Sequence, residues 1–372
     1  MWSLACQVLN EAQLPIQSGS IVKHTSSTAA LGIIANPASG RDIRRLTSRA
    51  LVFPTVEKVN MIERLLGAFA ATGVGRVLMM PDLVGIAAGL LRAIDGRRGQ
   101  GDAAWPEVEF LEMPLTDSAL DTERAVERMR AAGVAAIVVL GGDGTHRIVA
   151  GACGDTPLAT LSSGTNNAFP DLREATLTGL AAGLLASGAV TPEEALVSNK
   201  RLRLRVGARE ELALVEVCVT RLEHVGARAV WDPASIAEVY AAFAEPDAIG
   251  LSSIVAGVSP VGRRQPQGAW VRCAGEGCGE VGGVWAPIAP GLVVPVPIAA
   301  SGVLSPDEPV SLHTLRGSVA LDGEREIELD GRQAASVTLE LDGPRSLDVP
   351  ATLAAAIRRG ALRYPAGAGG QR

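Results

Sequence analysis

The chain has 372 residues, a length that favours two domains and leaves room for a third at roughly 150 residues per domain. Hydrophobic residues make up 47% of the sequence and charged residues 20%, so the chain can bury a core and is not a disordered protein. The net charge of −6 and the scarcity of aromatic residues, with 5 Phe, 5 Trp and 2 Tyr, argue against a nucleic-acid partner.

The cysteine content indicates a cellular compartment, and two uncharged stretches raise the question of a membrane span. Five cysteines are an odd number in a long chain, which excludes a disulfide scaffold and favours a reducing cytoplasm. The uncharged stretch 175–192 contains several glycines and predicts a buried helix, whereas the stretch 281–306 is interrupted by Pro287, Pro290, Pro295 and Pro297 and predicts strands. Neither stretch predicts a membrane span. Residues 1–28 are expected to be a loosely ordered extension.

Before residue 195, short apolar runs alternate with amphipathic segments. The apolar runs predict strands at 30–35, 75–80, 108–113, 134–140 and 158–161, and apolar residues at helical spacing predict a helix at 56–71. Asp121 near an N-cap and Gly133 at the end predict a second helix at 121–132. Strands that are buried on both faces and alternate with helices indicate a mainly parallel α/β domain over residues 29–195. Ligands of such sheets bind at the carboxyl ends of the strands.

After residue 195 the helical pattern fades and alternating patterns take over. Strands are expected at 202–206, 212–219, 317–321, 326–329 and 335–341, with one helix at 232–243. The sequence therefore predicts a β-rich second domain over residues 196–350. Residues 351–372 form a C-terminal segment that could return to the first domain and that ends in a glycine-rich tail, expected to be mobile.

The motif with the most chemical content is GGDGT at 141–145, directly after the apolar run 134–140. Adjacent glycines let the backbone approach a ligand closely, and their N–H groups, with the start of the next helix, can bind phosphate oxygens. A carboxylate repels phosphate, so Asp143 at this place indicates a residue that takes a proton or contacts a metal ion. The alternative is that Asp143 only caps the following helix.

Two further loops follow strands at the same edge of the predicted sheet. NPASGR at 36–41 offers small residues, a hydroxyl and a cation for phosphates, although a plain turn also explains it. SSGTNN at 162–167 offers amides and hydroxyls for a ribose or base edge, with a polar loop as the alternative. Three such loops would form one cleft. The candidate ligand-binding residues are Asn36, Ser39, Gly40, Arg41, Gly141, Gly142, Gly144, Thr145, Gly164, Thr165, Asn166 and Asn167.

The two residues directly after the GGDGT motif are weaker candidates for phosphate binding. His146 begins the next helix, where a phosphate contact is conceivable and a partly exposed first-turn histidine is the expectation. Arg147 is a candidate phosphate clamp, like Arg41, with a surface arginine as the alternative.

NPxSG, GGDGT and GTxN together resemble motifs of the superfamily that contains the NAD kinases and the diacylglycerol-type lipid kinases. The sequence over roughly residues 30–350 is similar to the acetoin-catabolism protein X branch of this superfamily. The similar segments are 33–46, 79–82, 140–151, 161–170, 225–233 and 248–257. The resemblance implies an N-terminal α/β domain and a C-terminal β-sandwich that closes over the cleft. It also implies ATP or polyphosphate as donor, Mg²⁺, NAD as substrate and self-association into a homo-oligomer.

The resemblance also implies roles for three carboxylates. Asp143 would be the base or the orienting group for the ribose 2′-hydroxyl of NAD. The segment LDGER at 321–325 is similar to an element that supplies a catalytic glutamate in the lipid kinases, which makes Glu324 a rival base and Asp322 a candidate metal ligand. On the residues alone, Asp322 and the glycine after it are equally typical of a hairpin turn.

These expectations lead to one function and two alternatives. The leading hypothesis is a cytoplasmic, ATP-dependent kinase of the NAD kinase-like type, acting on NAD or a related nucleotide without a nucleic-acid or membrane partner. The first alternative is a lipid kinase acting on diacylglycerol-like alcohols. The second is a non-catalytic nucleotide-binding protein linked to acetoin catabolism.

Overall fold

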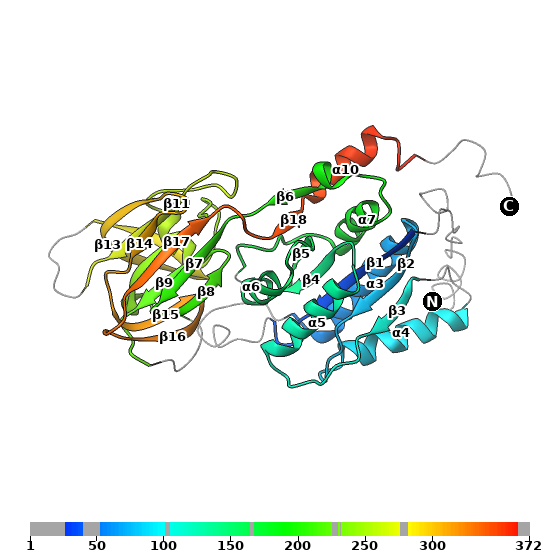
Figure 1. Ribbon diagram of the computed structural model, residues 1–372, viewed down its shortest axis with the longest axis horizontal. Coiled ribbons are helices and arrows are strands. Elements are labelled where there is room, and N and C mark those ends of the chain that lie inside the picture. The colour runs from blue at the N-terminus through cyan, green and yellow to red at the C-terminus, as the bar shows by residue number, and fades with distance from the viewer. Residues whose placement is uncertain are drawn as a thin grey trace, which may run out of the picture.

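The computed structural model describes residues 27–39, 53–100, 105–163, 167–224, 230, 232–275 and 282–363. These residues form an α/β domain and a β-sandwich domain that lie side by side along the long axis of the molecule (Figure 1). Residues 1–26 of the extension expected at 1–28 and residues 364–372 of the C-terminal segment expected at 351–372 lie outside the described residues, which begin with β1 and end after α10.

The α/β domain contains a seven-stranded sheet in the order β3-β2-β1-β4-β5-β18-β6. All neighbouring strands in it are parallel except β6, which runs antiparallel to β18. The strands are β1 (Ser27–Ala35), β2 (Val74–Met79), β3 (Glu107–Phe110), β4 (Ile137–Gly141), β5 (Leu158–Ser162), β6 (Leu196–Ser198) and β18 (Arg345–Leu347). The parallel α/β architecture predicted for the N-terminal part is confirmed.

Helices cover both faces of this sheet (Figure 1). They are α3 (Thr55–Ala71), α4 (Ile86–Gln100), α5 (Ala119–Ala131), α6 (Asp143–Ala152), α7 (Ala175–Ala186), α8 (Pro192–Ala195) and α10 (Val349–Arg358). Strand β1 shows why its sequence is a continuous apolar run: Leu31 and Ile33 belong to the core beneath α3 and α7, while Ile34 belongs to the core beneath α5. The last segment of the chain, β18 and α10, packs on β5 and α7.

The β-sandwich domain consists of a seven-stranded sheet, β12-β13-β11-β10-β9-β15-β16, and a four-stranded sheet, β14-β17-β7-β8. Leu204 of β7 and Val337 of β17 share one core with Val217 of β9 and Val319 of β15, which confirms the predicted β-sandwich. The strands and short helices are β7 (Arg201–Val206), β8 (Arg209–Ala213), β9 (Glu216–Thr220), η1 (Pro233–Ser235), β10 (Ile236–Ala241), α9 (Ser252–Ala256), β11 (Gly268–Cys273), β12 (Gly283–Ala289), β13 (Leu292–Leu304), β14 (Pro309–Ser311), β15 (Arg316–Leu321), β16 (Glu324–Asp330) and β17 (Ala335–Glu340).

Two element predictions are wrong in this domain. The helix predicted at 232–243 is the short helix η1 followed by strand β10, which pairs with β9 and β11. All six residues of β10 are buried, with Val239 and Tyr240 in different cores, so its sequence lacks the alternation that marks a half-buried strand. The single strand predicted at 212–219 is two strands, β8 and β9.

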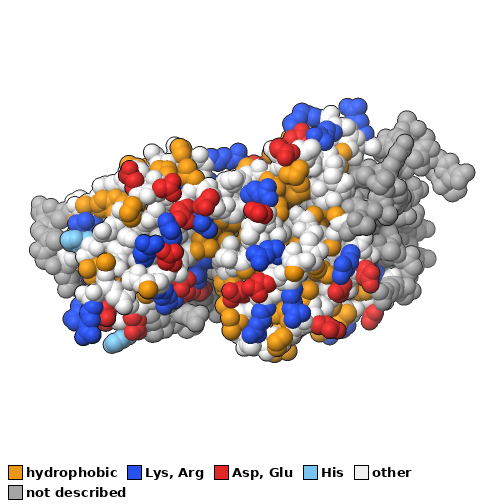
Figure 2. All heavy atoms as spheres, in the orientation of Figure 1, with side chains coloured by type: hydrophobic (Ala, Val, Ile, Leu, Met, Phe, Trp, Pro, Cys, Tyr) orange, Lys and Arg blue, Asp and Glu red, His pale blue; other side chains and the backbone are white. Residues whose placement is uncertain are grey.

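The surface of the face shown in Figure 2 mixes acidic and basic side chains over both domains. Three arginines of β7 illustrate this mixing, because Arg201 and Arg203 both pair with Glu340 and Arg205 pairs with Glu210. Within the described part of the chain, no helix combines the length and the apolar character needed to cross a bilayer.

Candidate functional site

The loops that follow β1, β4 and β5 meet at the carboxyl edge of the sheet. Asn36 Nδ2 donates a hydrogen bond to Thr145 Oγ1 at 2.8 Å, which joins the first loop to the GGDGT motif. Ser39 Oγ and Ser163 Oγ are 2.9 Å apart and share a hydrogen bond, which joins the first loop to the third. The three loops that the sequence predicted to lie together are therefore joined by side-chain hydrogen bonds.

A buried lysine that the sequence did not suggest holds the first loop in place. Lys58 of α3 has an exposed fraction of 1% and donates from Nζ to the carbonyl oxygens of Asn36, Pro37 and Ser39, at 2.9, 3.1 and 2.9 Å. Three carbonyl groups aimed at one ammonium fix the backbone of this loop. The available signal was a lysine on an apolar helix face, four positions before the buried Ile62.

Side chains of the site lie directly against two glycines of the motif. A β-carbon at Gly141 would lie 2.5 Å from Cβ of Thr145, and one at Gly142 would lie 2.8 Å from Oδ1 of Asn167. Larger residues therefore do not fit at these positions. Asn167 in turn donates from Nδ2 to Ser162 Oγ at 2.8 Å, so its carboxamide lies over the motif.

Asp143 is the first residue of α6 and its side chain is bonded to the third loop. Its carboxylate accepts the backbone N–H of Phe169 at 2.8 Å and that of Ala168 at 2.9 Å. The residue has an exposed fraction of 8%. The carboxylate is thus held in one orientation beside the glycine backbone, in contact with the loop that follows β5.

His146 is completely buried, so the expectation of a partly exposed histidine is wrong. Its Nδ1 lies 2.9 Å from the carbonyl oxygen of Gly142, and its ring packs at 5.9 Å from that of Phe169. Burial lowers the pKa of His146 to about 4, so the ring is neutral at neutral pH. The neutral ring contacts the Gly142 carbonyl group and helps to fix the backbone of the motif.

The β15–β16 hairpin brings Glu324 to the same motif. The turn between Leu321 and Glu324 has φ of 49° at Asp322 and 82° at Gly323, the left-handed pair of a type I′ hairpin. Oε1 of Glu324 would lie 3.3 Å from a β-carbon at Gly144, so its carboxylate lies against the motif from the other domain. Within the described ranges, no other residue forms a hydrogen bond or ion pair with this carboxylate.

Asp322, the candidate metal ligand, is buried beneath the hairpin. Its carboxylate accepts the backbone N–H groups of Leu214, Val215 and Glu216 at 2.8 to 3.2 Å. Burial raises its pKa, opposed by the Arg147 guanidinium nearby. The described parts of the chain contain no cluster of three His, Cys, Asp or Glu side chains that could hold a metal ion. The surroundings of Asp322 are thus those of a structural carboxylate.

Arg147, considered above as a phosphate clamp, instead joins the two domains. It extends from α6, donates from Nη2 to Glu326 Oε1 and lies with Nε 3.9 Å from Asp322 Oδ2. Its side chain is 8% exposed, so these carboxylates compensate a buried charge. The site is therefore tied to the sandwich domain next to Asp143.

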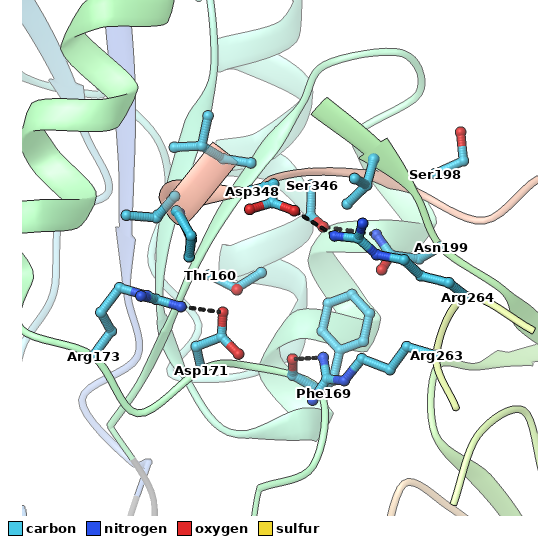
Figure 3. Close-up of a pocket in the computed structure, with 14 residues that line it drawn as sticks. Thr160, Phe169, Asp171, Arg173, Ser198, Asn199, Arg263, Arg264, Ser346 and Asp348 are labelled. Carbon is cyan, nitrogen blue, oxygen red and sulfur yellow. Dashed lines mark hydrogen bonds and ion pairs between the residues drawn. The ribbon is translucent and has the colours of Figure 1, made fainter. Parts of the chain in front are cut away.

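A cavity of about 370 Å³ lies beside the third loop, between β5, β6 and β18 and the segment that contains Arg263 and Arg264 (Figure 3). Its charged side chains are paired: Arg173 with Asp171 at 3.4 Å and Arg264 with Asp348. Arg263 donates to the carbonyl oxygens of Ala168 and Phe169. Asp171, Arg173, Arg263, Arg264 and Asp348 belong to none of the sequence motifs, which is why the sequence did not single them out.

The structure brings together Asn36, Ser39, Gly141, Gly142, Asp143, Gly144, Thr145, Asn167 and Glu324 at one place. The remaining candidates Gly40, Arg41, Gly164, Thr165 and Asn166 lie outside the described residues. The geometry offers glycine backbone, one fixed carboxylate and one carboxylate from the other domain within a single site.

Two family models match the two parts of the chain separately. Residues 31–190 match the ATP-NAD kinase N-terminal domain family, and residues 200–342 match the acetoin catabolism protein X C-terminal domain family. Among solved structures, yeast NADH kinase complexed with NADH has a TM-score of 0.46 at 15% identity, over 88% of this chain and 86% of the other. Acetoin catabolism protein X of Cupriavidus necator is 46% identical over 338 residues, which cover 90% of this chain and 94% of that protein. The chain belongs to the acetoin catabolism protein X family.

Proposed function

We propose that this protein is a kinase that transfers a phosphoryl group from ATP–Mg²⁺ to the 2′-hydroxyl of NAD or of a related nucleotide. The observation that carries the proposal is that Asp143 and Glu324, from different domains, both lie at the GGDGT backbone. The match to the ATP-NAD kinase N-terminal domain family supports the reaction type, and the name of the yeast neighbour motivates the choice of nucleotide.

The phosphates of the donor would lie on the glycine backbone between Gly141 and Gly144, where the N-terminus of α6 supplies a positive dipole end. The Asn36 and Thr145 side chains keep the first loop and the motif at a fixed separation through their hydrogen bond. Mg²⁺ would enter on ATP, where it neutralises phosphate charge. We assign no Mg²⁺ ligand to Asp322, because its carboxylate already accepts hydrogen bonds from three backbone amides.

In the transfer step the oxygen of the acceptor hydroxyl forms a bond to the γ-phosphorus, the bond to the ADP oxygen breaks and the hydroxyl proton leaves. We assign the proton to Glu324, whose carboxylate has no partner among the described residues and can move. Asp143 is held by two amides and would orient the hydroxyl by accepting its hydrogen bond. Positioning and charge neutralisation supply most of the rate in such reactions.

An acceptor panel tests this proposal. The protein is incubated with ATP–Mg²⁺, and separately with polyphosphate, in the presence of NAD, NADH, nucleosides and diacylglycerol vesicles, and products are identified by mass. A phosphorylated dinucleotide that disappears in Asp143→Asn supports the proposal. A phosphorylated lipid as the sole product would establish the lipid-kinase alternative, and binding of ATP or NAD without transfer would establish a non-catalytic nucleotide-binding protein.

A further inference from the structure

One short segment of the third loop is bonded on both of its sides. Asp143 accepts the N–H groups of Ala168 and Phe169, whereas Arg263 donates to the carbonyl oxygens of the same two residues. The bond from Arg263 Nη1 to the Phe169 oxygen is 2.7 Å long (Figure 3). Asp143 belongs to the α/β domain and Arg263 to the sandwich domain, so the segment links the two.

Arg263 is itself held in a fixed orientation. Its Nε donates to Glu245 Oε2 at 3.2 Å, and its guanidinium lies 4.6 Å from the ring centroid of Phe243. A guanidinium that uses its planar donors on two carbonyl groups and one carboxylate has little rotational freedom. The bonds to Ala168 and Phe169 therefore come from a rigid side chain.

The loop that carries Arg263 is fixed by a second buried lysine. Lys200, next to the start of β7, donates from Nζ to the carbonyl oxygens of Gly262, Gln265 and Gln267, at 3.0, 2.9 and 2.8 Å. Its exposed fraction is 6%. The arrangement repeats that of Lys58, which holds the loop after β1 through three carbonyls. Each lysine stabilises a loop that contributes to the surroundings of Asp143.

We propose that Arg263 is a positioning residue for Asp143. By holding the carbonyls of Ala168 and Phe169, it fixes the two amides that orient the Asp143 carboxylate. Glu324 lies in the same domain as Arg263, so this contact couples the alignment of the two carboxylates to the packing of the two domains. The inference rests on the proposed kinase activity for its rate effect, while its structural part stands on the hydrogen bonds alone.

Removal of the guanidinium leaves two carbonyl groups without a donor and lets the segment move. A misplacement of about 1 Å at a catalytic group can lower a rate on the order of 100-fold. For Arg263→Ala we expect kcat to fall about 10- to 100-fold, with KM for ATP changed less than about 2-fold, because Arg263 touches no residue assigned to the donor phosphates.

The kinetic test compares Arg263→Ala and Arg263→Lys with Arg209→Ala. Arg209 is an arginine of the same domain that pairs with Glu211 and contacts neither Ala168 nor Phe169. We expect the lysine variant to retain part of kcat and added methylguanidinium to restore part of kcat in Arg263→Ala, with Arg209→Ala unchanged. The proposal is overturned if Arg263→Ala and Arg209→Ala have equal kcat. It is also overturned if the loss of kcat/KM in Arg263→Ala comes entirely from a higher KM for ATP.

Amide hydrogen exchange in the nucleotide-free protein separates this inference from the proposed function. The Ala168 and Phe169 amides should exchange at least about 10-fold faster in Arg263→Ala than in Arg209→Ala, although their own acceptor, Asp143, is intact. Faster exchange in a protein that phosphorylates nothing would retain the positioning role and reject the kinase. Unchanged exchange in Arg263→Ala would reject the positioning role, whether or not the wild type is active.

Discussion

The Glu324 carboxylate lies against Gly144, with Oε1 only 3.3 Å from the place where a β-carbon on that glycine would stand. Gly144 is the second residue of α6, and Glu324 begins β16 in the other domain. The absence of a side chain at position 144 thus allows an acidic group from the sandwich domain to reach the motif. This contact places the proposed base within the glycine loop.

Gly144→Ala should therefore impair activity more than stability. Alanine gains up to about 1 kcal/mol of helix propensity over glycine, and Glu324 can yield by a few tenths of an ångström, so the unfolding free energy should change by about 1 kcal/mol or less. We expect kcat to fall about 10-fold because the carboxylate is displaced. Gly151→Ala in the same helix is the control, since its nearest foreign atom, Leu212 Cδ2, is 3.9 Å away. Equal kcat in the two variants would contradict the assignment.

Lys58→Met should destabilise both the protein and the donor site. It leaves the carbonyls of Asn36, Pro37 and Ser39 without their common donor, which we expect to lower the unfolding free energy by about 3 kcal/mol and to raise KM for ATP. Urea denaturation and steady-state kinetics measure the two effects. Arg64→Met on the exposed side of α3 breaks surface pairs with Glu57 and Glu174 and should cost less than about 1 kcal/mol. Equal losses in both variants would show that Lys58 has no special role.

The buried His146 predicts a loss of stability in mild acid. Its pKa is lowered from 6.5 to about 4, so between these pH values the unfolded chain binds a proton that the folded chain does not. The unfolding free energy should fall as the pH falls through this range, by about 3 kcal/mol at pH 4 from this residue. In His146→Asn the amide can still donate to Gly142, and this component of the pH dependence should disappear. Parallel stability profiles for wild type and variant would contradict the assignment.

Asp322→Asn separates a structural role from metal binding. Asparagine tolerates the positive φ of this position but cannot accept all three amides or neutralise Arg147, so we expect a loss of about 3 kcal/mol even with EDTA present. The Mg²⁺ concentration for half-maximal activity should stay within about 2-fold of the wild-type value, since we assign the metal to ATP. A large shift in that concentration, with stability in EDTA unchanged, would instead identify Asp322 as a metal ligand.

The sequence contains enough information to predict the α/β domain because its strands are buried on both faces. An apolar run such as 134–140 is typical of a buried parallel strand when a glycine-rich loop and a helix follow it. Parallel pairing of such strands then places the three loops that follow them at one edge of the sheet. The same burial made β10 unpredictable, since a strand covered on both faces has neither alternation nor helical periodicity to distinguish it from a buried helix.

The supporting residues of the site escaped prediction because they act on backbone atoms. Lys58, Lys200 and Arg263 all donate to backbone carbonyl oxygens. Every residue carries such a carbonyl group, so the sequence does not indicate which ones accept these hydrogen bonds. His146 has the same limitation, because its burial depends on Phe169 and on the α6 packing. Motif reasoning finds side chains that would touch a ligand and overlooks those that hold the loops.

Phosphoryl transfer beside Asp143, as proposed here, is examined by comparing two variants of buried carboxylates. Asp143→Asn is measured beside Asp121→Asn, another buried carboxylate in the first turn of a helix that accepts a backbone N–H. We expect wild type and Asp121→Asn to form the phosphorylated nucleotide at similar rates, whereas Asp143→Asn, with a thermal midpoint close to that of Asp121→Asn, should lose at least about 100-fold in kcat. Equal turnover by the two variants would contradict the proposal.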